Sequence, residues 1–298
     1  MILPNLKHLH YLVVLHQYQH FNKAAAACFI SQSTLSSAII KLEEQLNCQL
    51  IERDHKAFIF TQQGEEVVKM AQQLINNASD LVSYSQGQGD VEKGTLTIGC
   101  IPTIAPYLLQ DLAKASQKSL PELSLYFVEA TTENLLIQLQ QGAIDIALLA
   151  LPISGHNFKS KVLGQDAFYI AGDKALVERF TKSHDYQQLP EQSVFLLTQE
   201  NCLTEHALAA CKLADPSRIH QFSASSLSTL IQMTAFHKGF TFLPEMAVKK
   251  GLGINENLAM ERLGDDIYRD IGILWRPTSM RQQTYLRVGE LVESLLRS

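Results

Sequence analysis

Two cysteines in the second half of the chain are the residues best suited to redox chemistry. Cys202 and Cys211 lie nine positions apart and bracket a helix-forming segment with a partly apolar face. In a regular helix, nine residues rise about 13.5 Å and rotate by roughly 900°, which points the two thiols to opposite sides. A disulfide needs Cα atoms within about 7 Å of each other. If the segment is helical, the thiols can pair only when it unwinds, and we therefore expect a conformational switch here.

The number of cysteines and the lack of a signal peptide or membrane span indicate the cellular location of the protein. Cys28, Cys48 and Cys100 are scattered, and five cysteines in 298 residues are too few for a disulfide scaffold. The first residues lack the basic region and apolar core of a signal peptide, and the best apolar run, 144–153, is too short for a membrane span and contains Asp145. We expect a cytoplasmic protein, where a paired cysteine is more often redox-active than structural. The three scattered cysteines are interpreted as inert core residues.

Composition and motif searches narrow the functional class. The formal net charge is −5, which gives no global indication of nucleic-acid binding. The sequence contains no Cys/His cluster with zinc-ligand spacing, no P-loop and no Ser-His-Asp constellation. We therefore predict a protein without a metal ion, without a cofactor and without enzymatic activity.

Residues 31–46 combine an apolar stripe with a polar face. The stripe recurs at helical spacing from Leu35 to Leu46, and Ser31 is placed to cap the helix. Short hydrogen-bonding side chains and one lysine form the opposite face: Gln32, Ser33, Thr34, Ser36, Ser37 and Lys41. Such groups at the start of a helix are typical of a recognition helix in the major groove.

The next segment, 49–61, has the pattern of a short ribbon with a turn near 54–56. This ribbon would form a wing that holds Arg53 and Lys56 near DNA phosphates. Residues 1–87 nevertheless contain six lysines and arginines against seven acidic residues, so the usual basic footprint is missing. On pattern alone, a small helical bundle with a solvated polar face remains an alternative.

The first 65 residues resemble the winged helix-turn-helix of LysR-type transcriptional regulators. The matching positions are Ala24-Ala25, Ile30 to Ser36, Ile39, Lys41-Leu42-Glu43, Leu46, Leu50, Arg53 and Thr61 to Gly64. Asn47 and Ile51 depart from the usual Gly and Phe. The resemblance implies a DNA-binding domain over 1–62 with double-stranded promoter DNA as its partner.

A long helix is expected after this domain. No Gly or Pro interrupts 65–86, and apolar residues alternate by four and three from Val67 to Leu81. An amphipathic helix packed on its own domain would show the same pattern. The resemblance implies a dimerising linker helix over 63–87, a hinge over 88–94 and a homotetramer assembled as a dimer of dimers.

Beyond the hinge, strands and helices alternate, which predicts an α/β domain with mostly parallel sheets. The order resembles the two-lobed, periplasmic-binding-protein-like regulatory domain of the LysR family, here 95–298. Lobe I is expected at about 95–165 and 271–298, and lobe II at about 166–270. Thr103, Ser225 and Ser226 lie at helix starts, where they could either cradle a small anion in the inter-lobe cleft or simply cap the helices.

Around the two chemically suited cysteines the resemblance narrows to the OxyR-type peroxide sensors of this family. Their hallmark is Cys-Leu with a second cysteine nine positions after the first, which Cys202-Leu203 and Cys211 match. Supporting matches are Ile101-Pro102-Thr103, Pro106 to Leu109, Ser226-Leu227, Thr229-Leu230 and Trp275-Arg276-Pro277. One departure is Asn201, where the family usually has His.

This resemblance implies a mechanism and a set of roles. Cys202 reacts with hydrogen peroxide to form a sulfenic acid, and Cys211 resolves it to a reversible disulfide. Thr103 orients the peroxide, Arg276 stabilises negative charge, and Glu205 tethers a partner in the reduced pocket. The refolded segment re-spaces the DNA-binding domains and activates oxidative-stress genes. Thiol reductants would reset the protein, and RNA polymerase is a further candidate partner.

Two other functions are open at this stage. The chain could be a LysR-type regulator that responds to a small carboxylate-like effector in the inter-lobe cleft, with the cysteines incidental. It could also be a thiol peroxidase, although a peroxidase has no use for a DNA-binding first third. Retention of ligand-induced stabilisation after Cys202→Ser would favour the former, and catalytic consumption of peroxide the latter.

Overall fold

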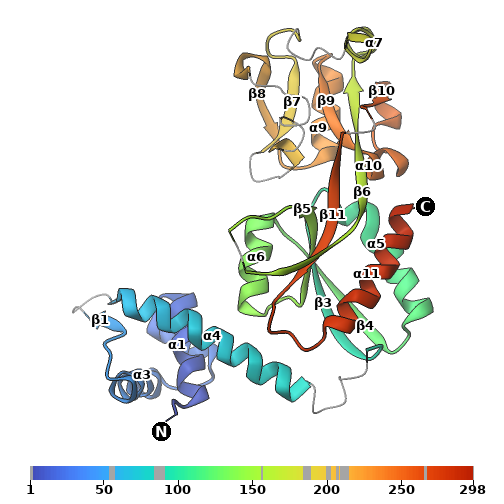
Figure 1. Ribbon diagram of the computed structural model, residues 1–298. Helices are drawn as coiled ribbons and strands as arrows, with labels where there is room; N and C mark the ends of the chain where they lie inside the picture. The colour runs from blue at the N-terminus through green and yellow to red at the C-terminus, as the bar shows by residue number, and fades with distance from the viewer. Residues whose placement is uncertain are drawn as a thin grey trace. The chain divides into compact units, whose positions relative to one another are not determined.

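The computed structural model describes residues 3–53, 58–83, 91–155, 157–183, 189–198, 203–205, 208, 215–264 and 267–297. The chain divides into two compact units, Met1–Gly87 and Gln88–Ser298, whose elements are labelled in Figure 1.

The first unit is built from helices followed by a two-stranded ribbon. Its elements are α1 (Leu6–Tyr18), α2 (Phe21–Ala27), α3 (Gln32–Leu46), β1 (Ile51–Arg53), β2 (Phe58–Phe60) and α4 (Gln62–Ser83). The two strands are antiparallel, with Ile51 opposite Phe60. The apolar stripes of α1 and α3 meet in one core, where Leu12, Leu35 and Ile39 are completely buried. This is the predicted winged helix-turn-helix, with the tip of the wing, and hence Lys56, outside the described residues.

Local sequence explains where α3 begins and ends. The Ser31 hydroxyl accepts a hydrogen bond from the Thr34 N–H at 3.1 Å, which confirms the predicted cap. Asn47 ends the helix in the left-handed region at φ 47°, a conformation that asparagine tolerates better than most residues. The substitution of Asn for the usual Gly is therefore compatible with the turn.

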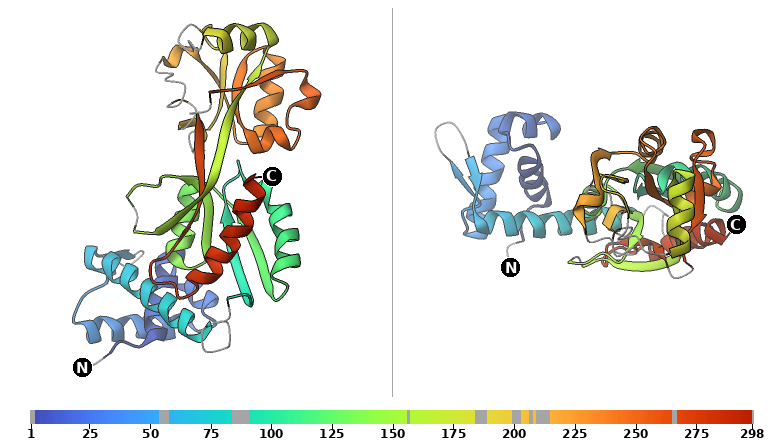
Figure 2. Two further views of the ribbon diagram at one scale, coloured as in Figure 1. Left: turned by 45° about the vertical axis from the view of Figure 1, so that its right-hand side comes forward. Right: turned by 90° about the horizontal axis from the view of Figure 1, so that it is seen from above.

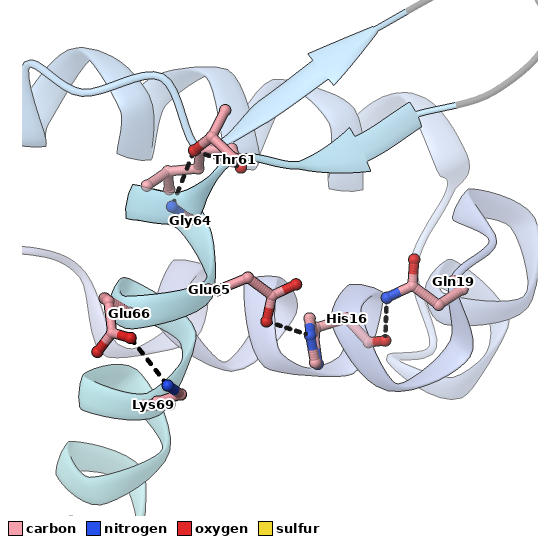
Figure 3. A network of polar contacts seen from close by, with 8 residues as sticks. His16, Gln19, Thr61, Gly64, Glu65, Glu66 and Lys69 are labelled. Atoms are coloured by element: carbon pink, nitrogen blue, oxygen red, sulfur yellow. Dashed lines mark hydrogen bonds and ion pairs between the residues drawn. The ribbon is translucent and has the colours of Figure 1, made fainter.

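The start of α4 is fixed by a second capping arrangement, shown in Figure 3. The Thr61 hydroxyl donates to the Gln49 carbonyl at 2.8 Å and accepts from the Gly64 N–H at 2.9 Å. A Cβ at Gly64 would lie 2.1 Å from the Leu50 carbonyl oxygen, so only glycine fits there. Farther along, Glu65 contacts His16 of α1 at 2.9 Å and thereby joins α4 to the helical core.

The second unit contains a nine-stranded mixed sheet with helices on it. The elements of lobe I are β3 (Gly94–Cys100), α5 (Ala105–Ser119), β4 (Leu123–Glu129), α6 (Thr132–Gln141), β5 (Ile146–Leu151) and α11 (Gln282–Arg297). Those of lobe II are α7 (Lys174–Ser183), β7 (Val194–Leu197), β8 (Ile219–Ala224), α9 (Leu227–Phe236), β9 (Phe240–Pro244), α10 (Glu245–Lys249) and β10 (Ala259–Arg262), with short 3-10 turns at Pro216–Arg218 and Ile254–Glu256. Each lobe has its own apolar core.

Two long strands run through both lobes, as Figure 1 and Figure 2 show. They are β6 (Lys159–Gly172) and β11 (Tyr268–Trp275), in the sheet order β4-β3-β5-β11-β6-β9-β7-β8 with β10 against β6. Strand β3 pairs parallel with β4 and β5, and β7 pairs parallel with β8 and β9. The crossing strands β6 and β11 pair antiparallel with each other, because they carry the chain between the lobes in opposite directions, and antiparallel with their neighbours β5, β9 and β10. The sheet is thus mixed rather than mostly parallel, and the expected lobe boundaries near 165 and 271 fall inside continuous strands.

The described residues contain no single helix that could span a membrane and no cluster of side chains that could hold a metal ion. No helix there is both long and apolar enough to cross a bilayer by itself, and α2 and α3 pass that test only as a pair bent by 98°. The same residues include no group of three or more His, Cys, Asp or Glu side chains placed to hold a metal ion.

Candidate functional site

The exposed face of α3 carries the predicted recognition residues. Gln32, Ser33, Thr34, Ser37 and Lys41 are all exposed, as their position opposite the apolar stripe requires. The Ser31 hydroxyl lies 2.9 Å from that of Ser33 and 2.7 Å from that of Thr34, so the first turn presents a connected row of hydroxyl groups. These groups can both donate to phosphate oxygens and accept from base edges.

The wing arginine is held against this face. Arg53 Nη1 donates to the half-buried Ser36 hydroxyl at 3.1 Å, and its guanidinium lies 5.7 Å from the centre of the Phe21 ring. Glu43 stands 4.0 Å from the same guanidinium while accepting hydrogen bonds from the Leu50 and Ile51 N–H groups. Arg53 and Ser36 are therefore brought together, while Lys56 lies outside the described residues.

Sequence reasoning missed the contribution of α1 to this surface. A groove of about 420 Å³ separates α1 from α3, and it is lined by hydroxyl, amide and basic side chains without a carboxylate: Asn5, Lys7, His8, Tyr11, Ser33, Thr34, Ser37, Ala38 and Lys41. His8 Nδ1 is buried there without a hydrogen-bond partner. Burial and the positive charge of Lys41 both lower the pKa of His8. A groove of this composition suits the negatively charged DNA backbone.

A buried polar network lies where β6 and β11 cross between the lobes. Thr103, Asp166 and Arg269 are at most 3% exposed. Arg269 Nη1 donates to the Thr103 hydroxyl at 2.8 Å, and Nη2 donates to the Thr103 carbonyl at 3.1 Å. Arg269 also forms an ion pair with Asp166 at 2.9 Å, and Asp166 accepts the Met246 N–H at 3.0 Å. The network connects lobe I, both crossing strands and α10 of lobe II.

The guanidinium beside Thr103 is therefore that of Arg269, which sequence reasoning missed. Arg276 Nη1 donates to the carbonyls of Leu139 and Ile144, at 2.8 Å each, and so holds the turn after α6 in lobe I. Seven residues of extended chain span up to about 23 Å, which separates the two arginines along β11. The structure does not bring Arg276 to Thr103. The signal that could have identified Arg269 is its position two residues before the apolar run 271–275, at the start of a buried strand.

The expected redox segment is described only in part. Leu203–Glu205 are helical, and Cys202, Cys211 and Asn201 lie outside the described residues. Leu203 is 2% exposed within the core of lobe II, and the buried Thr204 hydroxyl donates to the Leu197 carbonyl at 3.0 Å. These two residues anchor the first turn to β7. Glu205 is exposed.

The candidate effector residues differ in what they do. Ser226 caps α9, since its hydroxyl accepts the Thr229 N–H at 3.3 Å and donates to the Thr229 hydroxyl at 3.1 Å. Ser225 is exposed beside it. Thr103 is not a cap, because the cap position of α5 is Ile104 and its side chain makes no capping bond. The Thr103 hydroxyl is instead committed to Arg269.

Of the other cysteines, Cys100 is buried, and Cys28 and Cys48 are half-buried. Cys100 is completely buried at the end of β3, and burial raises the pKa of its thiol. Burial also raises the pKa of the half-buried Cys28. Cys48 lies 3.3 Å from Gln63 Oε1. Thiols whose neutral form is favoured react poorly with oxidants.

The first unit is a winged helix-turn-helix, and the second is a two-lobed α/β unit with a buried polar network between its lobes. This combination defines a transcriptional regulator that contains a DNA-binding domain and a sensing domain in one polypeptide. The chain belongs to the LysR family: residues 6–65 match the bacterial regulatory helix-turn-helix of the lysR family, and residues 89–297 match the LysR substrate binding domain.

Several characterised relatives are similar along nearly the whole chain. The HTH-type transcriptional regulator EstR of Acinetobacter baylyi is 34% identical over 95% of this chain and 94% of its own length. The DNA-binding transcriptional dual regulator OxyR of Escherichia coli is 32% identical over 97% of this chain and 95% of its own.

Solved structures similar to this chain include those of OxyR proteins. The reduced regulatory domain of OxyR2 from Vibrio vulnificus is 46% identical, with a TM-score of 0.66, over 70% of this chain and 98% of its own. A full-length OxyR variant from Pseudomonas aeruginosa is 27% identical, with a TM-score of 0.75, over 98% of this chain and 95% of its own.

Proposed function

We propose that this LysR-family regulator senses hydrogen peroxide through a reversible Cys202–Cys211 disulfide and activates oxidative-stress genes in the cytoplasm. The main support is the 46% identity to the OxyR2 regulatory domain of Vibrio vulnificus, which extends over most of the second unit. Relatives named hydrogen peroxide-inducible genes activator, such as that of Haemophilus influenzae at 33% identity, add to it.

The proposed reaction requires hydrogen peroxide, the two cysteine thiols and a cellular dithiol, without a cofactor. The Cys202 thiolate attacks one peroxide oxygen, so that an S–O bond forms, the O–O bond breaks and the leaving hydroxide takes a proton to become water. The Cys211 thiolate then attacks the sulfenic sulfur, so that the S–S bond forms, the S–O bond breaks and the leaving hydroxide takes a proton to become a second water. A cellular dithiol reverses the bond by thiol–disulfide exchange. Each protein molecule is oxidised once per signal, so no catalytic turnover is expected.

The buried network supports a site for this reaction. Arg269 holds its positive charge in the protein interior, where pairing with Asp166 makes burial tolerable. A fixed cation near a thiol favours the thiolate, and the Thr103 hydroxyl can hydrogen-bond a peroxide oxygen. We assign the charge-stabilising role to Arg269 in preference to Arg276, whose guanidinium bonds to backbone carbonyls instead. Glu205 is retained as the proposed tether in the reduced pocket.

The proposed output requires DNA binding by a homo-oligomer. On the linker helix α4, Ala71 of the expected seam is buried in the core of the first unit, whereas Leu74 and Leu81 of that seam are 47% and 63% exposed in the single chain. Met70 is 61% exposed one turn before Leu74. Apolar side chains at heptad-like spacing are suited to a helix–helix seam, so we propose that α4 dimerises and that dimers pair into tetramers. The α3 face and Arg53 would contact the promoter, Lys56 would add a phosphate contact, and RNA polymerase is a proposed downstream partner.

Titration with hydrogen peroxide tests the proposal. Reduced protein is mixed with about one equivalent of peroxide, quenched by thiol alkylation and mapped by mass spectrometry, and DNA footprints are compared before and after. We expect a Cys202–Cys211 disulfide and a changed footprint, both lost in Cys202→Ser and retained in Cys48→Ser. Absence of that disulfide in the wild-type chain would rule out the mechanism.

A carboxylate-responsive regulator is the second candidate. Two observations favour it: the similarity to EstR, whose name carries no mention of peroxide, and Asn201 in place of the usual His before Cys202. In this case Ser225 and Ser226, at the start of α9, would hold the effector. Stabilisation by carboxylates that survives Cys202→Ser and is lost in Ser226→Ala would select this function.

A further inference from the structure

A cavity of about 260 Å³ lies at the junction of the lobes, on the side of α5, α10 and the end of α11. Thr103, Arg269, Ser225 and Ser226 do not line it, whereas Asp166, the ion-pair partner of Arg269, does. The cavity therefore borders the buried network but does not contain the candidate peroxide and effector residues. The residues on which its chemistry depends are Tyr107 and Leu108 of α5, Glu245 and Lys249 of α10, and Leu295 and Leu296 of α11. Both lobes therefore contribute to its wall.

Most of the charges in this wall are already neutralised. Asp111 accepts a hydrogen bond from Lys250, which lowers the pKa of that carboxyl and joins α5 to α10. Asp166 is paired with Arg269. Glu245 and Lys249 make no ion pair within the described part of the chain. The cavity therefore presents one acidic and one basic group that a ligand can engage.

These two groups are matched in position as well as in sign. Glu245 is the first residue of α10 and Lys249 the last. Residues four apart share one helix face, with Cβ atoms about 6 Å apart. A molecule with an ammonium and a carboxylate on the same carbon fits between them, with each of its charges near the opposite charge of the helix.

The rest of the wall suits the remainder of such a molecule. Leu108, Leu295 and Leu296 provide an apolar surface. Tyr107 is half-buried at the same wall, where burial raises the pKa of its hydroxyl and keeps it a hydrogen-bond donor. The volume is below the range of about 300–1,000 Å³ that holds drug-sized ligands, which indicates a smaller molecule.

We propose that this cavity binds an α-amino acid with an apolar side chain. Its ammonium would pair with Glu245, its carboxylate with Lys249 and the Tyr107 hydroxyl, and its side chain would pack on the leucines. Because α5 and α11 belong to lobe I and α10 to lobe II, a bound amino acid stabilises the observed arrangement of the lobes together with the Asp111–Lys250 pair. This site adds a metabolite input to the proposed peroxide response and does not depend on it.

Calorimetric titration of the full chain tests the site. The Cys202→Ser protein, in reducing buffer, is titrated with L-leucine, L-methionine and L-phenylalanine, and in parallel with 4-methylpentanoate and isopentylamine, which lack the ammonium and the carboxylate of leucine respectively. We expect at least one of the amino acids to bind and the two single-charge analogues to bind about tenfold or more weakly. Glu245→Gln and Lys249→Met should each weaken amino-acid binding about tenfold, whereas Lys118→Met, on the exposed last turn of α5, should not.

Three outcomes would overturn the proposal. They are absence of binding by all three amino acids up to about 10 mM, equal binding of leucine and its single-charge analogues, and binding that is unchanged in both α10 variants but lost in Ser226→Ala. The analogue comparison uses unaltered side chains in the cavity, so it holds even if an α10 variant is unstable. Because Cys202→Ser cannot form the disulfide, failure of the peroxide mechanism would leave these results unaffected.

Discussion

Arg269 reaches Thr103 through two hydrogen bonds, 2.8 Å to the hydroxyl and 3.1 Å to the backbone carbonyl, although 166 residues separate them in the chain. The pair joins the turn before α5 to a crossing strand. Asp166 on the other crossing strand completes the network. A change at any of these residues therefore acts on the lobe junction and on the proposed peroxide site together.

Comparison of Thr103→Val with a matched control variant separates the effect on stability from the effect on the peroxide reaction. The substitution keeps the shape of the side chain and leaves Arg269 Nη1 without its acceptor, which should lower the free energy of unfolding by about 1–3 kcal/mol. It should also slow formation of the Cys202–Cys211 disulfide at low peroxide, measured by quenched alkylation. Thr241→Val is the matched control, because the buried Thr241 hydroxyl bonds to the Phe195 carbonyl at 2.7 Å. If both variants oxidise at the wild-type rate, Thr103 has no role in the peroxide reaction.

Substitution of Arg269, within β11, and of Arg276, directly after it, should affect different properties of the protein. Arg276→Met removes the donor shared by two buried carbonyls and should destabilise lobe I by about 1–3 kcal/mol while leaving the rate of Cys202 oxidation unchanged. Arg269→Met should slow that oxidation about tenfold or more, since it removes the fixed positive charge. Urea unfolding measures the stability of each variant, and alkylation of samples quenched at successive times after peroxide addition measures the rate of Cys202 oxidation. The reverse pattern would return the charge-stabilising role to Arg276.

Acidification should destabilise the DNA-binding unit through His8. Its pKa is lowered below the ordinary value of 6.5 by burial and by Lys41. Between that lowered pKa and 6.5 the unfolded chain binds more protons than the folded one, so stability is full above about pH 6.5 and falls as the pH drops through this window. Unfolding by urea at pH 7.5 and 5.5 should show a smaller difference for His8→Gln than for wild type. His10→Gln, at an exposed position of the same helix, should retain the wild-type difference.

Lys41 should contribute to DNA affinity through phosphate rather than through bases. Lys41→Met should weaken binding to specific and nonspecific duplexes alike and reduce the slope of log affinity against log salt by about 0.9. Fluorescence anisotropy over a series of salt concentrations measures this slope. Lys69→Met is the control, because Lys69 is paired with Glu66 on α4 at 2.8 Å. A loss of affinity confined to one DNA sequence would instead indicate base contact by Lys41.

Local features of this protein followed from the sequence. The cap at Ser31, the apolar stripe from Leu35 to Leu46 and the polar face of α3 depend on residues a few positions apart, so helical periodicity was enough to predict them. Most strands of the second unit were recognisable for the same reason, since alternating and buried apolar runs are local patterns, whereas β8 and β10 were not predicted. The family was indicated by the resemblance of the first 65 residues to the winged helix-turn-helix of LysR-type regulators, and the family models match.

Which side chains meet across the fold was decided only by the tertiary structure. The antiparallel pairing of β6 and β11 places Arg269 opposite Asp166, about a hundred residues earlier in the chain, and Arg269 rather than Arg276 contacts Thr103. The groove between α1 and α3 and the cavity beside α10 likewise depend on packing between distant elements. Sequence periodicity determines which face of an element is apolar, but the neighbour opposite a given side chain is determined by strand register and helix packing.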